Sequence, residues 1–240
     1  MQSVDLSIII PCFNEGPTFS QSVSRIESVL NKTKYNWEII FVEDKSTDET
    51  KRTVEEIVNK SKNKRAIFHT TNQGRGKTVS DGILASGGKI CGFLDVDLEV
   101  SAEYIPLFVA EIENGSDVAI GMRFYESGSS SLARVLASRT YALIVKLFVK
   151  LPIKDSEAGY KFFNRKNILP ILKKTKDKGW FWDTEICARA YWAGLRVSQI
   201  PVLFVKRVEK KSTVRLVPDS LEYLSKIIKF RSQAQLHESK

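Results

Sequence analysis

The stretch ICGFLDVDLE, at residues 90–99, decides how the chain is interpreted. Its first half is apolar enough for a buried strand, and its second half places three carboxylates, Asp95, Asp97 and Glu99, at alternate positions. On extended backbone, residues two apart point the same way, so these three acids would share one face. Open α/β sheets bind ligands where their strands end, and hard divalent cations prefer oxygen ligands. The stretch therefore predicts a cation site that can bridge to a diphosphate, although a solvated acidic turn would show the same pattern.

Upstream of this stretch, apolar runs alternate with amphipathic segments. We expect buried strands at residues 6–11 and 37–42 and a short third strand at residues 66–69, with Pro11 ending the first of them. Three helices would separate the strands: one capped by Thr18 or Ser20, one reaching about Lys60 and one at residues 78–85 after a glycine-rich loop. The first of these helices would turn four apolar side chains inward: Val23, Ile26, Val29 and Leu30. This alternation predicts right-handed crossovers and a mostly parallel sheet.

Downstream, the pattern continues with fewer strands. Residues 101–114 read as a helix with four inward side chains: Ile105, Phe108, Val109 and Ile112. A strand at residues 117–121 would end just before Arg123. Residues 168–174 and a segment ending near Gly194 are expected helices, and residues 196–205 form a strand interrupted at Pro201, near a sheet edge.

Length and composition set wide bounds on the class of protein. The 240 residues suffice for one large or two small domains, and 42% hydrophobic residues are ample for a core. We expect a catalytic domain at residues 1–215 and an amphipathic helix and tail at residues 216–240. Three dispersed cysteines in apolar runs predict reduced core thiols, and the N-terminus lacks the pattern of a signal peptide. The net charge of +9 favours an anionic partner without choosing among nucleic acid, lipid and phosphorylated substrate.

Seven motifs occur in order, and together they are more specific than any one of them. They are IIIPCFNE at 8–15, VEDKSTDET at 42–50, NQGRGK at 72–77, DVDLE at 95–99, IGMRF at 120–124, DSEAGYKFF at 155–163 and WDTE at 182–185. Over residues 5 to 213 the chain resembles family 2 glycosyltransferases of the GT-A fold, and most nearly the dolichyl- or polyprenyl-phosphate mannosyl- and glucosyltransferases. The resemblance implies a single α/β domain with a Rossmann-like, mostly parallel central sheet flanked by helices. It also implies inverting transfer of a sugar from a UDP- or GDP-sugar with Mg²⁺ or Mn²⁺.

The same resemblance implies a donor site. Asp44 matches an acid that binds the nucleotide base or ribose, although a helix N-cap would also explain an Asp here. Lys77 follows two glycines and could reach a phosphate, or belong to a solvated basic loop. Asp95 would contact the ribose and the metal region. The residues expected to bind the donor are Pro11, Phe13, Glu15, Val42, Asp44, Lys77, Asp95, Val96, Asp97 and Arg207.

The metal and the acceptor complete the expected site. Asp95, Asp97 and Glu99 would surround the cation, with Glu99 standing where many relatives have Gln or Ser. Arg123 and Arg139 would bind an acceptor phosphate, because a guanidinium pairs two donors with phosphate oxygens. A hydroxyl acceptor, such as a glycan, would instead need a general base, and the candidate is Asp183. The expected catalytic residues are therefore Asp97, Arg123 and Asp183.

Several segments favour work at a membrane surface. Residues 132–151 are apolar but contain four cations, which excludes an ordinary membrane span. An amphipathic helix on a membrane and a core helix with basic outer positions both remain open. Residues 126–131 are rich in Gly and Ser and would form a lid, and the tail would dock on the domain, lie on lipid or mediate dimerisation. We expect a cytoplasmic protein in peripheral contact with the cytoplasmic face of a membrane.

The resemblance is weaker in one loop, and other classes need consideration. Residues 207–213 match a loop that closes on the donor diphosphate, but Lys210 replaces its Gly and Thr213 replaces its closing Lys. A nucleotidyltransferase would show an N-terminal glycine-rich loop, which the sequence lacks, and a non-catalytic binder would have lost one of the acids. Nucleic acid is not an expected partner, since no helix-turn-helix, zinc or RNA-binding signature is present.

Overall fold

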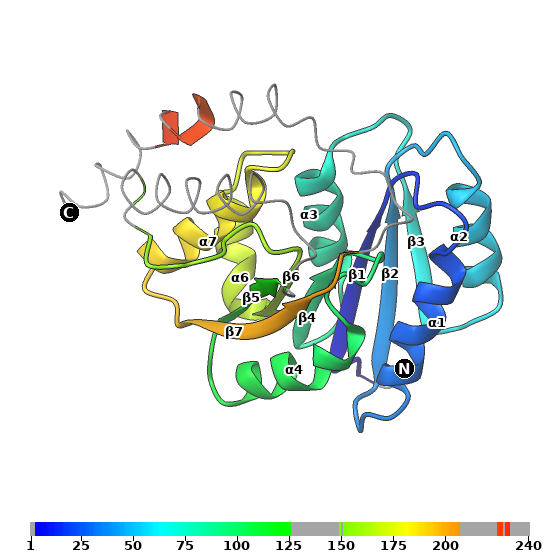
Figure 1. The fold of residues 1–240 in the computed structure, drawn as a ribbon, viewed down its shortest axis with the longest axis horizontal. Coiled ribbons are helices and arrows are strands. Elements are labelled where there is room, and N and C mark those ends of the chain that lie inside the picture. Colours follow the sequence, from blue (N-terminus) through cyan, green and yellow to red (C-terminus); the bar gives the residue numbers. More distant parts are fainter. Residues whose placement is uncertain (1–2, 126–148, 150, 207–224, 228, 231–240) are drawn as a thin grey trace.

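One seven-stranded sheet organises the molecule (Figure 1). The computed structural model describes residues 3–125, 149, 151–206, 225–227 and 229–230. Within them the strands are β1 Leu6–Cys12, β2 Trp37–Glu43, β3 Lys64–Phe68, β4 Ile90–Leu94, β5 Val118–Tyr125, β6 Tyr160–Asn164 and β7 Val197–Phe204. Their order across the sheet is β3-β2-β1-β4-β6-β5-β7. Only β6 runs antiparallel to its neighbours, so the prediction of a mostly parallel sheet is confirmed.

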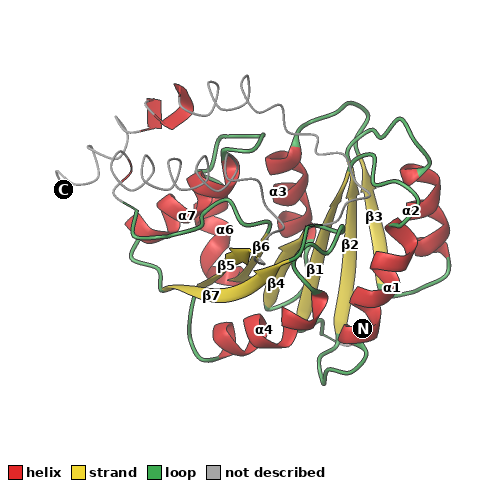
Figure 2. Cartoon of the chain, viewed as in Figure 1, coloured by secondary structure: helices red, strands yellow, loops and turns green. Residues whose placement is uncertain are grey.

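Helices cover both faces of this sheet (Figure 2). The first face packs against α1 Phe19–Leu30, α2 Thr50–Asn59, the short 3-10 helix η1 Ala102–Tyr104 and α4 Ile105–Glu113. The second face packs against α3 Arg75–Ala85, α6 Arg165–Leu172 and α7 Trp182–Trp192. The two layers of helices give the molecule two hydrophobic cores, one on each face of the sheet.

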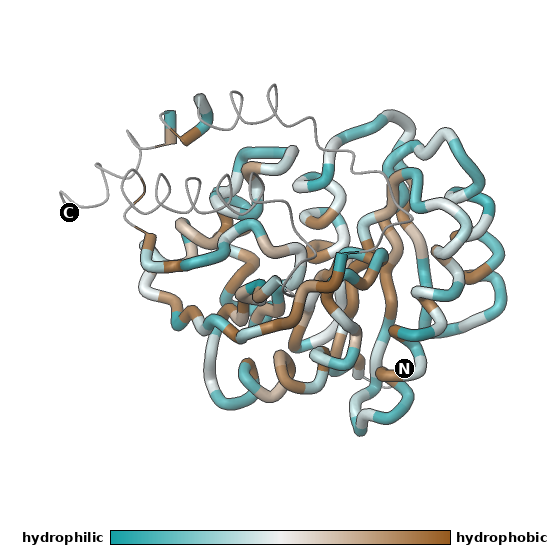
Figure 3. Tube along the Cα trace, in the orientation of Figure 1, coloured by the Kyte–Doolittle hydropathy of each residue, from teal (hydrophilic) through white to brown (hydrophobic). Residues whose placement is uncertain are grey.

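The apolar strands explain why both faces are covered. In β1, Ile8 and Ile10 point into the first core, whereas Ile9 points into the second. A strand that is apolar at every position must bury both faces, and the brown strands in the middle of Figure 3 show this arrangement. The inward side chains expected of α1 and α4 are all buried, as predicted. Thr18 occupies the N-cap position of α1, but its side chain makes no capping hydrogen bond.

Pro11 does not end β1, which corrects the expectation. The strand continues to Cys12, with Pro11 paired to Val42 of β2. On its other side β1 pairs with β4 only from Leu6 to Ile9. That flank is therefore open at Pro11, and a residue without an N–H is tolerated where no ladder bond is needed.

Three further boundaries differ from expectation. Helix α3 begins at Arg75 and not near Thr78, so Gly76 and Lys77 belong to its first turn. A glycine is required there, because a Cβ on Gly76 would lie 2.4 Å from Cβ of Trp182. Strand β5 runs on to Tyr125 and places Arg123 inside it, and β7 is continuous through Pro201. As predicted, β7 lies at the sheet edge, where proline is tolerated.

The C-terminal segment contacts the domain. The ring of Phe230 stacks on Trp192 with centroids 5.0 Å apart, and it meets Phe181 edge-on at 5.4 Å. Lys226 Nζ lies 2.7 Å from Asp177 Oδ2. Of the three roles open for the tail, the described residues therefore show docking on the domain. The expected boundary at residues 215–216 lies outside the described residues.

Two expectations from composition can be checked in the described part of the chain. Cys12, Cys91 and Cys187 are free and buried, which confirms the prediction of core thiols. Burial raises the pKa of Cys91 and of Cys187 to about 12, so neither forms a thiolate at neutral pH. None of the helices described is long and apolar enough to cross a membrane.

Candidate active site

The loops that follow β1 and β2 are hydrogen-bonded to each other at the carboxyl edge of the sheet. Asn14 N donates to Ser46 Oγ over 3.1 Å, and Glu15 N donates to Thr50 Oγ1 over 2.8 Å. Asn14 takes a positive φ of 53° to make this turn. Because side chains of one loop satisfy backbone groups of the other, the two loops form one preformed wall of the site.

The expected donor residues on these strands fall into two groups. Pro11, Phe13 and Glu15 are half-buried at the edge, and the Glu15 carboxylate accepts a hydrogen bond from Phe13 N over 3.0 Å. Val42 is 0% exposed and Val96 is 3% exposed, and both side chains belong to the cores. Any contact of these two valines with a donor would therefore use their backbone.

Asp44 anchors the loop in front of α3. Its carboxylate accepts hydrogen bonds from Gln73 N over 2.7 Å and from Gly74 N over 2.9 Å, and His69 Nδ1 lies 2.7 Å away. Helix α2 has Glu49 at its N-cap, so Asp44 is not the cap of that helix. Asp44 therefore joins the loop after β2 to the glycine-rich loop, both of which the resemblance places at the donor.

This geometry leads to a prediction for Asp44→Ala. The variant should fold but weaken binding of the nucleotide sugar by about 1–3 kcal/mol, because charged hydrogen bonds that hold the donor loops are lost. Isothermal titration calorimetry with the preferred donor would measure the change. Asp5→Ala, an acid before β1 at the opposite edge of the sheet, is the control. An unchanged affinity in Asp44→Ala would limit Asp44 to a structural role.

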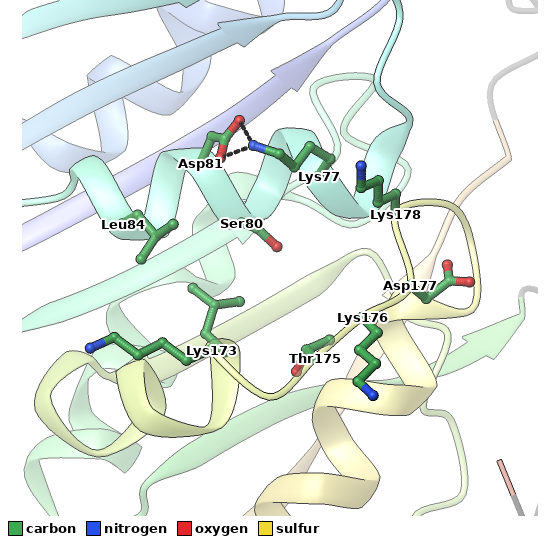
Figure 4. A pocket seen from close by; sticks show the side chains of 10 residues that line it. Lys77, Ser80, Asp81, Leu84, Lys173, Thr175, Lys176, Asp177 and Lys178 are labelled. Carbon is green, nitrogen blue, oxygen red and sulfur yellow. Dashed lines mark hydrogen bonds and ion pairs between the residues drawn. The ribbon is translucent and has the colours of Figure 1, made fainter.

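Lys77 is paired with a carboxylate of its own helix. Its Nζ lies 2.5 Å from both carboxylate oxygens of Asp81, which also faces His69 Nε2 at 3.0 Å. Lys77 and Asp81 line a cleft of about 190 Å³ between α3 and residues 173–178, with the amine turned toward Asp81 (Figure 4). The expected phosphate contact would need Lys77 to leave this pair.

The acidic stretch after β4 turns and does not stay extended. Asp95 N donates to Gly159 O over 3.1 Å, Leu98 N donates to Asp95 O over 3.2 Å, and Leu98 has a φ of 54°. The expected extended backbone is therefore wrong. The alternation of burial holds nevertheless, since Val96 and Leu98 are buried while Asp95, Asp97 and Glu99 are half-buried. A turn that buries its two apolar side chains leaves the three acids partly exposed.

A buried arginine joins two of the expected site residues. Arg75 Nη2 donates to Asp95 Oδ1 over 2.8 Å, and Arg75 Nη1 donates to Asp183 Oδ2. Its guanidinium also lies 5.3 Å from the ring centroid of Phe93 and 5.4 Å from that of Trp180. Burial lowers the pKa of Arg75, but the two carboxylates outweigh it and leave the pKa above its ordinary value. Arg75 is therefore a fixed cation between β4 and α7.

Lys161 completes this chain of charges. Its side chain is 0% exposed, and Nζ lies 2.5 Å from Asp183 Oδ1 and 2.5 Å from the carbonyl oxygen of Ala158. Asp183 is 2% exposed, and each of its oxygens meets one cation. An isolated buried carboxylate or ammonium is strongly disfavoured, so these groups depend on one another.

Arg123 is held by one carboxylate. Asp155 Oδ2 accepts from the backbone N of Arg123 over 3.0 Å and from Nε over 2.8 Å, and Asp155 Oδ1 accepts from Nη2 over 2.7 Å. Burial lowers the pKa of Arg123, but the hydrogen bonds and charge of Asp155 raise it above its ordinary value. The pair fixes the edge of the guanidinium formed by Nε and Nη2, and this holds the orientation of the whole group.

The residues at the end of β4 fit a divalent cation. The Asp95 carboxylate occupies space that a side chain at residue 159 would fill, because a Cβ on Gly159 would lie 1.8 Å from Asp95 Oδ2. Asp97 follows two residues later, and both acids supply hard oxygen ligands. No three His, Cys, Asp or Glu side chains gather as a metal site in the part of the chain that the structure describes. Mg²⁺ commonly uses one or two carboxylates together with substrate phosphates and water, so two acids suffice.

Some expected residues cannot be placed, and some placed residues were not expected. Outside the described residues lie Arg139, Arg207, the expected lid at 126–131 and the loop at 207–213. The expected amphipathic or core helix at 132–151 also lies outside them, apart from Val149 and Leu151. Sequence reasoning missed Arg75, and it gave Asp155 and Lys161 no individual role within the segment at 155–163, which the resemblance places on the sugar and acceptor side. The signal for Arg75 was its place between two glycines at the start of a helix. Asp155 and Lys161 stood in a motif that carried the resemblance.

The sheet order and the loops gathered at its carboxyl edge define an α/β protein whose candidate site lies where such sheets bind ligands. Solved structures share the fold: glucosyl-3-phosphoglycerate synthase from Mycobacterium tuberculosis with uridine diphosphate has a TM-score of 0.70 and 17% identity, over 95% of this chain and 80% of that one. S. aureus TarS 1-349 with UDP-GlcNAc has a TM-score of 0.60 and 19% identity, over 95% of this chain and 66% of that one. This likeness confirms the predicted GT-A-like α/β fold.

The sequence comparisons identify the family. The profile described as glycosyl transferase family 2 matches residues 7–196, and the chain belongs to this family of enzymes. The glycosyltransferase AglD of Haloferax volcanii is 29% identical over 94% of this chain, and the dolichyl-phosphate beta-glucosyltransferase of Saccharomyces cerevisiae is 28% identical over 84% of it. The dolichol-phosphate mannosyltransferase of Pyrococcus furiosus is 32% identical over 68% of it. The chain spans 37%, 67% and 47% of these three relatives, respectively.

Proposed function

We propose that this family 2 glycosyltransferase moves a sugar from a nucleotide diphosphate sugar to a polyprenyl phosphate. Relatives are named for dolichyl phosphate, and structural neighbours hold UDP or a UDP-sugar. A GDP-sugar remains the other donor class, as the sequence motifs imply. The net charge of +9 is compatible with an anionic lipid acceptor and with peripheral contact at a membrane surface.

The observation that carries the choice of acceptor is the state of Asp183. A hydroxyl acceptor needs a general base within hydrogen-bond reach of its proton. Asp183 is the candidate base, but Arg75 and Lys161 engage its two oxygens and only 2% of the residue is exposed. A phosphate acceptor is already anionic at neutral pH and needs no base, so this geometry favours phosphate.

Arg123 is suited to bind that phosphate. Asp155 engages Nε and Nη2, and within the described residues Nη1 has no hydrogen-bond partner. A guanidinium fixed along one edge can offer its other edge to two phosphate oxygens without losing further side-chain freedom. Asp155 would thus position Arg123 for the acceptor.

The reaction then needs little proton transfer. An acceptor phosphate oxygen attacks the anomeric carbon, the bond from that carbon to the donor diphosphate breaks, and the nucleoside diphosphate leaves with the electron pair. Asp95 and Asp97 would hold Mg²⁺ or Mn²⁺, which neutralises charge on the leaving diphosphate. Arg123 would orient the acceptor, and attack opposite to the leaving group would invert the anomeric configuration.

The test combines an acceptor assay with variants of Arg123. The protein would be incubated with a panel of UDP- and GDP-sugars, Mg²⁺ or Mn²⁺, and either polyprenyl phosphate or a glycan. We expect transfer to polyprenyl phosphate, and Arg123→Ala should raise the acceptor KM or lower kcat while donor binding stays intact. Arg123→Lys should recover only part of the loss, because paired donors become a point charge.

The control for this assay is Arg52→Ala, an exposed arginine of α2, which should behave like the wild type. Asp183→Asn should keep measurable transfer if the variant folds, since no proton has to be removed. Transfer to the glycan, no reaction of polyprenyl phosphate with any donor, and an Asp183→Asn variant that folds but is inactive would together overturn the proposal. The acceptor would then be a hydroxyl group with Asp183 as its base.

A further inference from the structure

Charged side chains from four parts of the fold meet beside the acceptor arginine. Arg123 comes from β5, Lys161 from β6, Asp183 from α7, and Asp155 and Glu157 from the segment that leads into β6. Arg123 is paired with Asp155 and Lys161 with Asp183. Arg75, which also bonds Asp183, has a second partner in Asp95.

Glu157 is the acid left over in this cluster. Each of the three cations forms an ion pair with a different acid: Arg75 with Asp95, Lys161 with Asp183 and Arg123 with Asp155. Glu157 is half-buried, and among the described residues its carboxyl makes no hydrogen bond or ion pair. It is therefore a carboxyl group without a partner among the described residues, two positions after the Asp155 that holds Arg123, and of the charged groups around it Arg123 acts on it most strongly.

The surroundings of Glu157 oppose its charge. Burial has the largest effect on the pKa of Glu157, and it raises it. The negative charges of Asp155 and Asp183 raise the pKa further, whereas the positive charges of Arg123 and Lys161 lower it. The net result raises the pKa of Glu157 to about 7. Near neutral pH this carboxyl group is thus available in its neutral form, which has an O–H donor, as well as in its charged form, which has none.

We propose that Glu157 is an acceptor-binding residue that, in its neutral form, donates a hydrogen bond to the acceptor phosphate held by Arg123. This inference rests on the proposed function and adds a residue to the same site. A neutral carboxyl group adds a hydrogen-bond donor to those of the guanidinium, whereas an ionised one would place an unpaired negative charge near the phosphate. Below about pH 7 binding consumes no proton, because Glu157 keeps its O–H bond; above it, the ionised carboxylate takes one proton from solvent when the acceptor binds.

The proposal fixes the sign of the pH dependence. Below about pH 7 Glu157 is neutral and the acceptor binds. As the pH rises through this value, the charged form increases, and kcat/KM for the acceptor should fall by about tenfold per pH unit, since this ratio follows the ionisation of the free enzyme. If Glu157 were instead a general base for a hydroxyl acceptor, activity would rise through the same pH.

The experiment compares the wild type with Glu157→Gln from pH 6 to pH 9, using a short-chain polyprenyl phosphate and saturating donor. An amide is close in size, donates through its NH₂ group and does not titrate. We expect the variant to keep acceptor kcat/KM within a few-fold of the wild type at pH 6 and to lose the alkaline fall. The second ionisation of the acceptor phosphate, near pH 6, affects both proteins alike and cancels in their ratio.

Two further variants separate a binding role from a structural one. Glu157→Leu removes the donor and should raise the acceptor KM by at least tenfold at pH 6, with donor affinity unchanged and without the alkaline fall of the wild type. Glu56→Gln, an exposed acid of α2, is the matched control and should keep the wild-type pH profile. A carbon-13 carboxyl titration of wild type and Glu157→Gln by NMR gives a readout without turnover: one signal titrating near pH 7 should be missing in the variant.

The outcomes are distinct. An alkaline fall that persists unchanged in Glu157→Gln overturns the inference while the transfer itself upholds the proposed function. A Glu157→Gln variant that loses activity a hundredfold, in an enzyme whose activity rises with pH, makes Glu157 a base and overturns both. No transfer to polyprenyl phosphate by the wild type at any pH also overturns both, because the acceptor class is then wrong.

Discussion

Asp97→Asn should lower the rate of sugar transfer about a hundredfold or more. The substitution keeps the size of the side chain but removes the charge that would hold the cation at the leaving diphosphate. A loss of about 3 kcal/mol of transition-state stabilisation corresponds to this factor. Initial rates at saturating donor, with Mg²⁺ and Mn²⁺ titrated separately, would measure it, and a chelator should bring the wild type down to a similar level.

The controls for this variant use other acids of the same chain. Glu56→Gln is exposed on α2 and should leave the rate unchanged. Glu99→Gln should cost less than Asp97→Asn, because the resemblance gives the clearer metal-binding role to Asp97. Turnover of Asp97→Asn close to that of the wild type, or a wild type that is indifferent to the chelator, would exclude the metal-dependent mechanism.

The parallel half of the fold could be predicted because its signals are local. Strands β1, β2 and β4 are short apolar runs followed by polar loops, and helix α1 shows its inward face in the sequence. The place of β6 could not be predicted, since it enters the sheet between β4 and β5, antiparallel to both. Its pairing with β4 joins residues some 70 positions apart in the chain, and no periodicity within one segment reports such a contact.

In the candidate site, too, the residues could be predicted from local motifs, but the contacts between distant segments could not. Asp44, Asp95, Asp97 and Asp183 were expected from motifs, and the structure places Asp95 and Asp183 on either side of one guanidinium. That guanidinium belongs to Arg75, whose motif was known but whose partners lie 20 and 108 residues away. The extended geometry expected for the acids was wrong because Leu98 turns the backbone to bury its own side chain.

The buried charges also limit how far the site can be changed without affecting the fold. Asp183 and Lys161 are both withdrawn from water, and Asp183 also engages Arg75, which fixes Asp95 at the end of β4. A substitution at one of these positions would therefore alter the stability of the domain and the placement of Asp95 together. Loss of activity in such a variant is informative only when its free energy of unfolding is measured as well.

Lys161→Met should lower the free energy of unfolding by about 3–5 kcal/mol. Lys161 is 0% exposed, and its removal leaves Asp183 with a single cationic partner and the Ala158 carbonyl oxygen without its donor. Removing one partner of a buried pair costs this much because the remaining charge stays desolvated and under-compensated. The methionine side chain is unbranched and only one heavy atom shorter than that of lysine, so the loss of packing is small. Urea denaturation followed by circular dichroism would measure the difference.

The exposed pair of Lys89 and Asp5 supplies the matched control. Lys89→Met makes the same chemical change where the lysine side chain is 78% exposed, and it should alter stability by about 1 kcal/mol or less. The double variant Lys161→Met/Asp183→Asn removes both charges and leaves Arg75 paired with Asp95, so its loss should be smaller than the sum of the two single losses. If Lys161→Met costs no more than Lys89→Met, or if the two buried substitutions are additive, the charges are not coupled. Asp183 would then be free to serve as a base, and the case for a phosphate acceptor would lose its main support.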